Sequence, residues 1–292
     1  MSPRAEPRAC VMGHGVAYSR SPLMHGHWLR TLQLDGGYDL VDVAPEAFED
    51  FLRHLARHGY VGGNVTRPHK DAAFRLVDDR DGAAEAIGAV NTVWLEDGRL
   101  AGGNTDAEGF LANLDQQAPG WDVAGGLAIV LGAGGAARAV VYALLERGFD
   151  IGVVNRTVAR GDDLVRHFRA RPRSWPRSWP RSWAFEELPR LLPDARFLVN
   201  TTSLGAKGQP PLDINLQRVR PEAVVCDINY VPLETGLLRA ARHLGHRTAD
   251  GLGMLMHQGV PGFARWFGVR PAVTPGLRQL LESDIRAREG AG

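Results

Sequence analysis

Two ionisable residues, Lys70 and Asp106, stand where a strand-like stretch gives way to a helix-like one. Lys70 ends NVTRPHK at 64–70, and Asp106 follows Thr105 in GGNTDAEGF at 102–110. Ligands of open α/β folds bind at such junctions. A lysine with its ordinary pKa of about 10.4 is protonated at neutral pH and can donate a proton to an oxyanion, while a carboxylate orients it and binds a hydroxyl. The pair indicates acid–base chemistry, although each residue alone also suits a solvated helix start.

Ser19 and Ser21 form a second candidate pair, just before Pro22. Alternate residues of an extended segment share one face, so both hydroxyls can meet one carboxylate. Helix capping is the alternative for Ser21, but it does not account for Ser19. His25 and His27 lack a third residue with metal-ligand spacing, so we expect helix packing there and no metal site.

The stretch LAIVLGAGGAAR at 127–138 runs from apolar residues into the spacing G-x-G-x-x-A at Gly132, Gly134 and Ala137. A strand, a tight turn and a helix N-terminus in this order bind a pyrophosphate through backbone N–H groups and the helix dipole. The stretch therefore predicts a dinucleotide site. A purely structural strand-turn-helix is the alternative.

The residues that follow the next predicted strand, Ile151–Val154, indicate which dinucleotide fits. NAD enzymes usually have Asp or Glu here to bind the ribose 2′-hydroxyl, whereas a basic residue suits a 2′-phosphate. This chain has Asn155, Arg156 and, about one helical turn on, Arg160. Because arginine presents a planar fork to phosphate, we expect NADP rather than NAD. Solvated surface arginines are the alternative interpretation.

These residues need a scaffold of alternating strands and helices. Short stretches rich in β-branched residues predict strands, and segments with helical spacing that begin at or near proline predict helices. In the first hundred residues the predicted strands are Ala9–Met12, Tyr38–Val43, Val61–Val65 and Val90–Leu95, and the predicted helices are Pro22–Leu32, Pro45–His58 and Pro68–Val77. This βαβ rhythm indicates a mostly parallel sheet covered by helices.

A second α/β unit begins near Leu127 and ends near Gly245. Its further predicted strands are Ile151–Val154, Phe197–Asn200 and Ala223–Ile228. The amphipathic segments Leu252–Phe267 and Pro275–Arg288 have no strand of their own, so we expect them to return to the first domain. The prediction is a two-domain α/β protein. An N-terminal three-layer α/β substrate domain comprises 1–112 with 250–292, and a Rossmann-like NADP-binding domain comprises 113–249.

Composition excludes several classes of partner. The 292 residues are 44% apolar and carry a formal net charge of +1, so we expect a small-molecule substrate and no nucleic acid. No apolar run has the length to span a bilayer, and Cys10 and Cys226 are far apart. We therefore expect no membrane partner, no structural zinc and a reducing, cytoplasmic location. The oligomeric state stays open, with a homodimer as one alternative.

One low-complexity element, at 173–183, repeats RSWP with a period of four. Proline in each full unit prevents an α-helix, so the repeat predicts an extended surface loop. The other interpretation is a docking patch in which arginines stack between Trp175, Trp179 and Trp183.

Together, these motifs resemble the shikimate dehydrogenase family over nearly the whole chain. The matching stretches are SRSP at 19–22, NVTRPHK at 64–70, GAVNT at 88–92, GGNTD at 102–106, GAGGAAR at 132–138, NRTVAR at 155–160, NTTSLG at 200–205, DINYVPLET at 227–235 and DGLGMLMHQG at 250–259. Nine motifs in the right order are far more specific than any one of them. The resemblance implies an NADP-dependent oxidoreductase that reduces 3-dehydroshikimate to shikimate in chorismate and aromatic amino-acid biosynthesis.

The resemblance also implies a role for each matched residue. Lys70 is the implied catalytic lysine, and Asp106 is its paired aspartate. The implied substrate contacts are Ser19 and Ser21 to the carboxylate, Thr66, Asn91, Asp106 and Gln258 to ring hydroxyls, and Tyr230 closing over the substrate. The implied cofactor contacts are Gly132, Ala133, Gly134, Gly135, Ala136, Asn155, Arg156, Thr157 and Arg160, with Ile228 and Gly251 beside the nicotinamide.

Gly15, Tyr18 and Gly26 depart from the family's usual residues, and the RSWP repeat has no family counterpart; none of them supplies a proposed catalytic group. Two other functions remain as alternatives. One is a quinate/shikimate dehydrogenase that uses NAD or NADP, against which Arg156 and Arg160 argue. The other is a catalytically silent NADP-binding regulator, from which loss of Lys70 or Asp106 would be expected.

Overall fold

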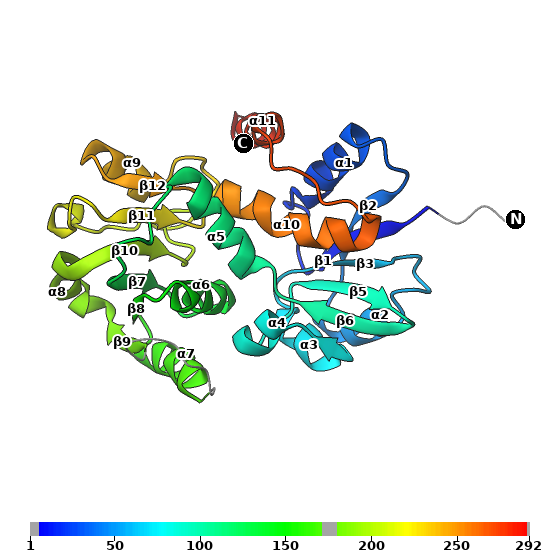
Figure 1. Ribbon diagram of the computed structural model, residues 1–292, viewed down its shortest axis with the longest axis horizontal. Helices are drawn as coiled ribbons and strands as arrows, with labels where there is room; N and C mark the ends of the chain where they lie inside the picture. Colours follow the sequence, from blue (N-terminus) through cyan, green and yellow to red (C-terminus); the bar gives the residue numbers. More distant parts are fainter. Residues whose placement is uncertain (1–5, 171–179, 291–292) are drawn as a thin grey trace, which may run out of the picture. The chain divides into compact units, whose positions relative to one another are not determined.

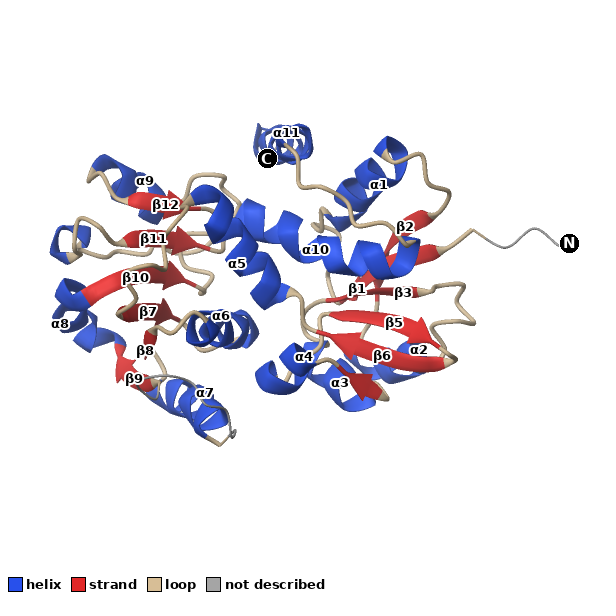
Figure 2. Ribbon diagram, viewed as in Figure 1, coloured by secondary structure: helices blue, strands red, loops and turns tan. Residues whose placement is uncertain are grey.

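The computed structural model describes residues 6–170 and 180–290. They form two compact units, each with its own sheet (Figures 1 and 2). Unit 1 comprises Met1–Thr105 with Gln258–Ser283, and unit 2 comprises Asp106–His257 with Asp284–Gly292. The two-domain α/β architecture is confirmed. The exact domain boundaries expected from the sequence stay a prediction.

Unit 1 is built on a six-stranded sheet in the order β2-β1-β3-β5-β6-β4. Its strands are β1 (Arg8–Gly13), β2 (Gly37–Asp42), β3 (Gly62–Val65), β4 (Asp79–Arg80), β5 (Thr92–Glu96) and β6 (Arg99–Gly103). Its helices are α1 (Ser21–Thr31), α2 (Phe48–Arg53) after a 3-10 turn at Pro45–Ala47, α3 (Lys70–Leu76) and α4 (Gly82–Ile87). The first three strands are parallel, whereas β5 runs antiparallel to both β3 and β6.

The sheet is mostly parallel, as predicted, and β5 is the one strand of the described residues in it that runs the other way. β5 and β6 form a hairpin whose turn is Asp97-Gly98, with φ angles of 50° and 77°. An Asp-Gly pair between two β-rich runs is a strong hairpin signal, so the sequence did contain this information. The predicted helix Pro45–His58 is also too long, because α2 ends at Arg53. Similarly, α3 begins only at Lys70, since Pro68 belongs to the turn that precedes it.

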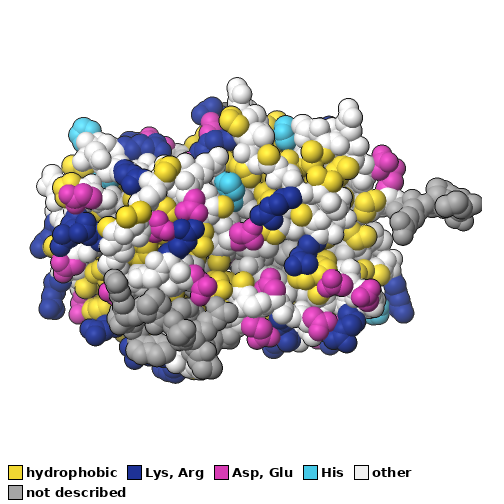
Figure 3. Space-filling view, viewed as in Figure 1, with side chains coloured by type: hydrophobic (Ala, Val, Ile, Leu, Met, Phe, Trp, Pro, Cys, Tyr) yellow, Lys and Arg dark blue, Asp and Glu magenta, His cyan; other side chains and the backbone are white. Residues whose placement is uncertain are grey.

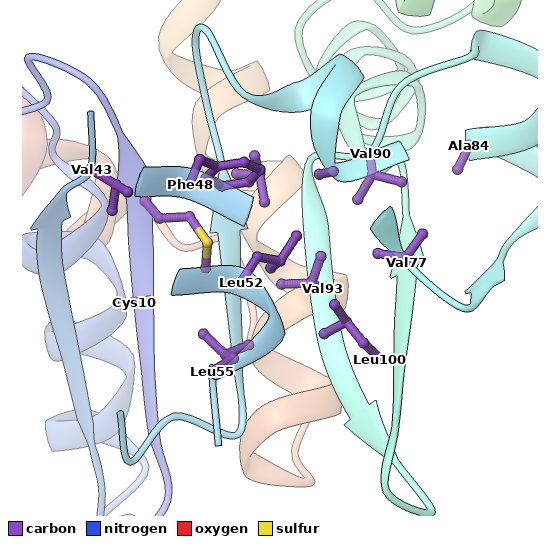
Figure 4. Packing of buried hydrophobic residues seen from close by; sticks show 13 residues of the cluster. Cys10, Val43, Phe48, Leu52, Leu55, Val77, Ala84, Val90, Val93 and Leu100 are labelled. Carbon is purple, nitrogen blue, oxygen red and sulfur yellow. The ribbon is translucent and has the colours of Figure 1, made fainter. Parts of the chain in front are cut away.

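The core of unit 1 lies between α2, α3 and the sheet (Figure 4). Phe48, Leu52 and Leu55 are each 1% exposed and pack in one cluster with Cys10 and Val93. Full burial of a side chain of this size stabilises the fold by about 1.5–3 kcal/mol. This cluster holds α2 and α3 on the sheet, and Lys70 is the first residue of α3.

Unit 2 has a six-stranded, all-parallel sheet in the order β12-β11-β10-β7-β8-β9. Its strands are β7 (Leu127–Leu131), β8 (Asp150–Asn155), β9 (Arg181–Ala184), β10 (Ala195–Asn200), β11 (Val224–Asp227) and β12 (Arg247–Ala249). Its helices are α5 (Asp106–Gln117), α6 (Gly135–Glu146), α7 (Val158–Arg169), α8 (Leu188–Leu191) and α9 (Gly236–His243), with 3-10 turns at Phe185–Glu187, Leu192–Asp194 and Leu216–Arg218. Counted from β7, this is the 3-2-1-4-5-6 order of doubly wound dinucleotide-binding folds.

Two helices follow the last strand, as predicted. α10 (Gly251–Phe267) and α11 (Pro275–Gly290) each contribute residues to both units. None of the described helices is long and apolar enough to cross a membrane. On the face that Figure 3 shows, basic and acidic side chains are interspersed, in keeping with the net charge of +1.

The RSWP repeat falls partly within the described residues. Trp175 and Trp179 lie outside them, so the predicted loop and docking patch are not described there. Trp183 belongs to the edge strand β9, which pairs with β8, and it packs against the hydrophobic core of unit 2. The last copy of the repeat is therefore a strand rather than a loop.

Candidate functional site

The strand register brings the substrate residues predicted in unit 1 to one edge of its sheet. β1 and β3 are parallel and pair Met12 with Val65, while antiparallel β5 pairs Thr92 with Asn64. The carboxyl ends of β1 and β3 therefore share an edge with the amino end of β5. Ser19 and Ser21 come after β1, Thr66 and Lys70 come after β3, and Asn91 precedes β5.

The chain after β1 passes closely by the chain after β3. A Cβ atom on Gly13 would lie 2.5 Å from Cγ2 of Thr66, so only glycine permits this approach. Farther along, the backbone N–H of Ser21 donates to Oγ of Ser19 at 3.3 Å. The hydroxyl of Ser19 therefore makes the capping-type contact. The alternative that Ser21 caps the helix is wrong, because Ser21 lies within α1 and the N-cap residue is Arg20.

Lys70 is the first residue of α3, and its side chain is half-buried. Its carbonyl oxygen accepts a hydrogen bond from the backbone N–H of Val90 at 3.1 Å. This bond ties the start of α3 to the segment that leads into Asn91. The helix start and the amino end of β5 are therefore held together by the backbone.

Asn91 is buried in a polar network that sequence reasoning missed. Its Oδ1 accepts from the backbone N–H of Thr105 at 2.9 Å and from the hydroxyl of Thr92 at 3.0 Å. The hydroxyl of Thr105 donates to the carbonyl oxygen of Gln258 at 2.8 Å. The network therefore fixes the residue immediately before Asp106, which begins α5. Polar residues directly beside apolar strands, as in GAVNT and GGNTD, were the available signal.

The glycine stretch in unit 2 has the geometry of a phosphate site. Gly132 follows β7 with a φ of 106°, and a Cβ atom there would lie 2.8 Å from Oγ1 of Thr201. α6 begins at Gly135 with Gly134 as its N-cap residue, and a Cβ on either would meet no heavy atom within 4 Å. The backbone is therefore open at the positive end of this helix, where a pyrophosphate fits.

The residues expected at the adenosine end come to the same edge of the sheet. β7 and β8 are parallel neighbours and pair Leu131 with Val154. Asn155, the last residue of β8, therefore lies beside the glycine turn that follows β7. Nδ2 of Asn155 donates to the carbonyl oxygen of Thr157 at 2.7 Å and orders the turn into α7. Arg156 and Arg160 are exposed. Their guanidinium groups suit a 2′-phosphate, so these residues fit NADP.

Ile228 and Tyr230 lie in the loop that follows β11. The backbone N–H of Ile228 donates to the carbonyl oxygen of Asn200 at 3.1 Å. Gly251, the first residue of α10, approaches this loop so closely that a Cβ atom on it would lie 2.0 Å from the carbonyl oxygen of Ile228. Gly251 is thus required at this contact, which holds the loop from one side.

Asn200, Asp227 and Thr235 were missed as candidate residues. All three are fully buried at the same edge of the unit 2 sheet. Burial raises the pKa of Asp227 to about 6, and hydrogen bonds from Asn229, Thr235 and Asn200 offset part of that rise. Within the described ranges, no group of three or more His, Cys, Asp or Glu residues could hold a metal ion.

Comparisons with known proteins identify the family. Residues 11–93 match the shikimate dehydrogenase substrate binding domain. The chain is 54% identical over 281 residues to the NADP(+) shikimate dehydrogenase of Methylocella silvestris, covering 96% of this chain and 98% of that protein. Among solved structures, the shikimate 5-dehydrogenase of Thermus thermophilus in complex with NADP(H) and shikimate has a TM-score of 0.81 at 36% identity, over 96% of this chain and 99% of that one.

A quinate dehydrogenase from Corynebacterium glutamicum in complex with NAD has a TM-score of 0.86 at 28% identity, over 95% of this chain and 99% of that one. Its fold is the same, but its sequence is much less similar than that of the NADP(+) enzyme. Of these three proteins, only the Methylocella enzyme shares more than half of its residues with this chain over nearly the full length of both. The chain belongs to the shikimate dehydrogenase family.

Proposed function

We propose that this protein catalyses the reversible NADPH-dependent reduction of 3-dehydroshikimate to shikimate, a step of chorismate and aromatic amino-acid biosynthesis. The observation that carries the proposal is the 54% identity, over nearly the whole chain, with an NADP(+) shikimate dehydrogenase. The open helix start at Gly134 and Gly135 and the exposed Arg156 and Arg160 support NADP as the cofactor.

Lys70 and Asp106 carry the proton chemistry in this proposal. During reduction the ammonium group of Lys70 donates a proton to the oxygen of the substrate's 3-carbonyl, and in the reverse direction the amine accepts it. Asp106 orients that ammonium group and binds the neighbouring hydroxyl. Both residues begin helices, α3 and α5, so their backbones are held by regular hydrogen bonding.

The substrate is oriented by neutral hydrogen-bonding groups. The hydroxyls of Ser19 and Ser21 bind its carboxylate; Ser19 lies in the turn before α1, and Ser21 is the first residue of α1. Thr66, Asn91 and Gln258 bind its ring hydroxyls, and Tyr230 closes over it. Thr66 and Asn91 border the same sheet edge, which supports their acting on one ligand.

The cofactor is held along the carboxyl edge of the unit 2 sheet. NADPH, when bound, supplies the hydride. Backbone N–H groups of 132–136 bind its pyrophosphate, and Asn155, Arg156, Thr157 and Arg160 bind the adenosine end with its 2′-phosphate. Ile228 and Gly251 border the nicotinamide ring and shield it from water.

The organisation of the whole protein follows from this assignment. The substrate domain consists of 1–112 with 250–292, and the NADP-binding domain of 113–249. We place the protein in the cytoplasm. This location suits Cys10 and Cys226, which are buried and not disulfide-bonded. A homodimer is the proposed oligomeric state.

A steady-state assay of the purified protein tests the function. Oxidation of shikimate by NADP+ is followed as NADPH absorbance, in parallel with quinate as substrate and NAD+ as cofactor. We expect the highest kcat/KM for shikimate with NADP+. A higher kcat/KM for quinate with NAD+ would support the second candidate function, for which the likeness to the Corynebacterium quinate dehydrogenase is the relevant observation. Tight NADPH binding without any turnover would instead support a regulator.

A further inference from the structure

Asp227 accepts an unusual number of hydrogen bonds for one buried side chain. It is the last residue of β11 and is fully buried. Its Oδ1 accepts from Nδ2 of Asn200 at 3.1 Å and from the backbone N–H and Nδ2 of Asn229, each at 3.0 Å. Its Oδ2 accepts from the hydroxyl of Thr235 at 2.8 Å. All four donors are neutral, and no residue of the described ranges forms an ion pair with this carboxylate.

This carboxylate lowers the stability of the folded state at neutral pH. Burial raises the pKa of Asp227 to about 6, so the folded protein binds its proton more tightly than the unfolded chain does. A neutral side chain of similar size would avoid that loss. Packing of the core therefore does not explain why an aspartate stands at position 227. The segments that its carboxylate holds by hydrogen bonds offer the explanation.

On one side, Asp227 holds the loop that follows β10. Asn200, which donates to it, accepts through Oδ1 from the backbone N–H of Thr202 at 3.0 Å and from its hydroxyl at 2.7 Å. Nδ2 of Asn229 also donates to the carbonyl oxygen of Thr202 at 2.9 Å. The neighbouring residue, Thr201, touches the glycine turn, because a Cβ atom on Gly132 would lie 2.8 Å from its Oγ1. The network thus holds both neighbours of Thr201, the residue that lies beside the glycine turn.

On the other side, Asp227 holds the loop that follows β11. Its bond to the backbone N–H of Asn229 fixes the chain between Ile228 and Tyr230. Its bond to Thr235 fixes the far end of the same loop, since Thr235 is the N-cap residue of α9 and accepts from the backbone N–H of Leu238 at 3.4 Å. One carboxylate therefore anchors both ends of the loop.

We propose that Asp227 is a positioning residue for the nicotinamide end of the cofactor, which acts by holding the loops at 200–205 and 228–235 in a single arrangement. The inference rests on the proposed function for the roles of Ile228 and Tyr230. The four neutral donors demand a side chain that only accepts at both of its oxygens, and ionised aspartate is the short side chain that does so. Charge-assisted hydrogen bonds also hold their donors more tightly than neutral ones.

Kinetics of two variants test the proposal. Asp227→Ala removes all four acceptor contacts, so kcat should fall about 10-fold or more, because a misplacement of about 1 Å at a reacting group can cost 10²-fold. KM for NADP+ should rise less than about threefold, since the phosphate contacts at 132–136 and 156–160 belong to other strands. Asp227→Asn keeps the shape and one acceptor oxygen for the three donors at Oδ1, but its NH2 group cannot accept from Thr235, so kcat should fall between the values of wild type and Asp227→Ala.

A control variant separates positioning from loss of stability. Asp122 pairs with Arg147 in the same unit and has no assigned role in the site. Asp122→Ala should lower the Tm without changing kcat. The proposal is wrong if Asp227→Ala also lowers the Tm without changing kcat. It is also wrong if the changes in kcat and KM of the two variants simply follow their losses in Tm.

Amide hydrogen exchange tests, without any assay of turnover, whether Asp227 holds the two loops. In Asp227→Ala, amides of 200–205 and 228–235 should exchange faster than in wild type and in Asp122→Ala, while those of β7 and β8 should not. Unchanged exchange in the two loops, or faster exchange throughout unit 2, would overturn the proposal. If the wild type oxidises no shikimate, the proposed function fails by itself, and the exchange result still decides the role of Asp227.

Discussion

Lysine is rare in this chain. Of its 34 Lys and Arg residues, only Lys70 and Lys207 are lysines. Arginine stays protonated in proteins and cannot alternate between donating and accepting a proton, whereas lysine can. A lysine at the sheet edge of unit 1, in a protein that otherwise uses arginine for positive charge, is therefore a chemical requirement of the proposed reaction.

Lys70→Met should abolish the proton transfer while leaving the apolar stem of the side chain in place. We expect kcat for shikimate oxidation to fall about 10²–10⁴-fold, the usual contribution of a general acid or base, with KM for shikimate changed by less than about threefold. Lys207→Met is the matched control, because Lys207 is exposed and its side chain donates to the backbone carbonyl of Arg288. A Lys70→Met enzyme with nearly wild-type kcat would show that Lys70 is not the acid–base group.

At the scale of elements, the β7-turn-α6 segment is constrained by backbone geometry. Gly132 has a φ of 106°, which side chains of L-residues strongly disfavour, and it lies against Thr201. Gly134 and Gly135 face open space instead. The three glycines that look alike in the sequence thus differ in structure: Gly132 makes the turn possible, and Gly134 and Gly135 leave open the space proposed for the phosphate.

Gly132→Ala tests the first of these tasks. The strained backbone and the contact with Thr201 should lower the free energy of unfolding by about 1–3 kcal/mol and raise KM for NADP+. Gly236→Ala, at the start of α9 and with no heavy atom within 4 Å of the added Cβ, should change the free energy of unfolding by less than about 1 kcal/mol. Urea titrations of both variants provide the comparison, and equal stability of the two would contradict the role assigned to Gly132.

The described residues form two units with separate cores, and in each sheet the residues proposed to bind ligands follow or precede strands at one edge. Unit 1 contains a buried aromatic cluster in which the ring of His25 stacks on Tyr38 at 4.0 Å and on Phe263 at 5.9 Å between ring centroids. Burial lowers the pKa of His25 from 6.5 to about 3, and a contact with Asn64 offsets only part of this shift. The core of unit 1 therefore requires this imidazole to be neutral.

The pH dependence of stability follows from that requirement. In the unfolded chain His25 binds a proton as the pH falls below about 6.5, whereas in the folded protein it does not until about pH 3, so acid favours unfolding. The loss approaches about 1.4 kcal/mol per pH unit. Between pH 6.5 and about 5, wild type should lose about 1.6 kcal/mol more than His25→Phe, which retains ring stacking. Urea titrations at both pH values measure this, and equal losses in the two proteins would refute it.

Much of the fold could be predicted because its signals are local. The strands around Ala9–Met12 and Ile151–Val154 and the helices after Pro22 and Pro275 follow from residue spacing within a few turns of chain. The reversed direction of β5 in unit 1 was not predicted, although the Asp97-Gly98 turn that precedes β6 is typical of a hairpin. The last strand of unit 2 was missed because it is only three residues long.

The sequence by itself determined the family, the cofactor and the functional candidates, because motif order and residue type are properties of the chain alone. Tertiary structure decided which strand ends share an edge, and so which candidates can meet one ligand. It also decided that Asn200 and Asp227, which are 27 residues apart, form a hydrogen bond. Such a contact depends on the register of β10 and β11, which no local pattern specifies. Asp227 therefore emerged as a positioning residue only from the packed sheet.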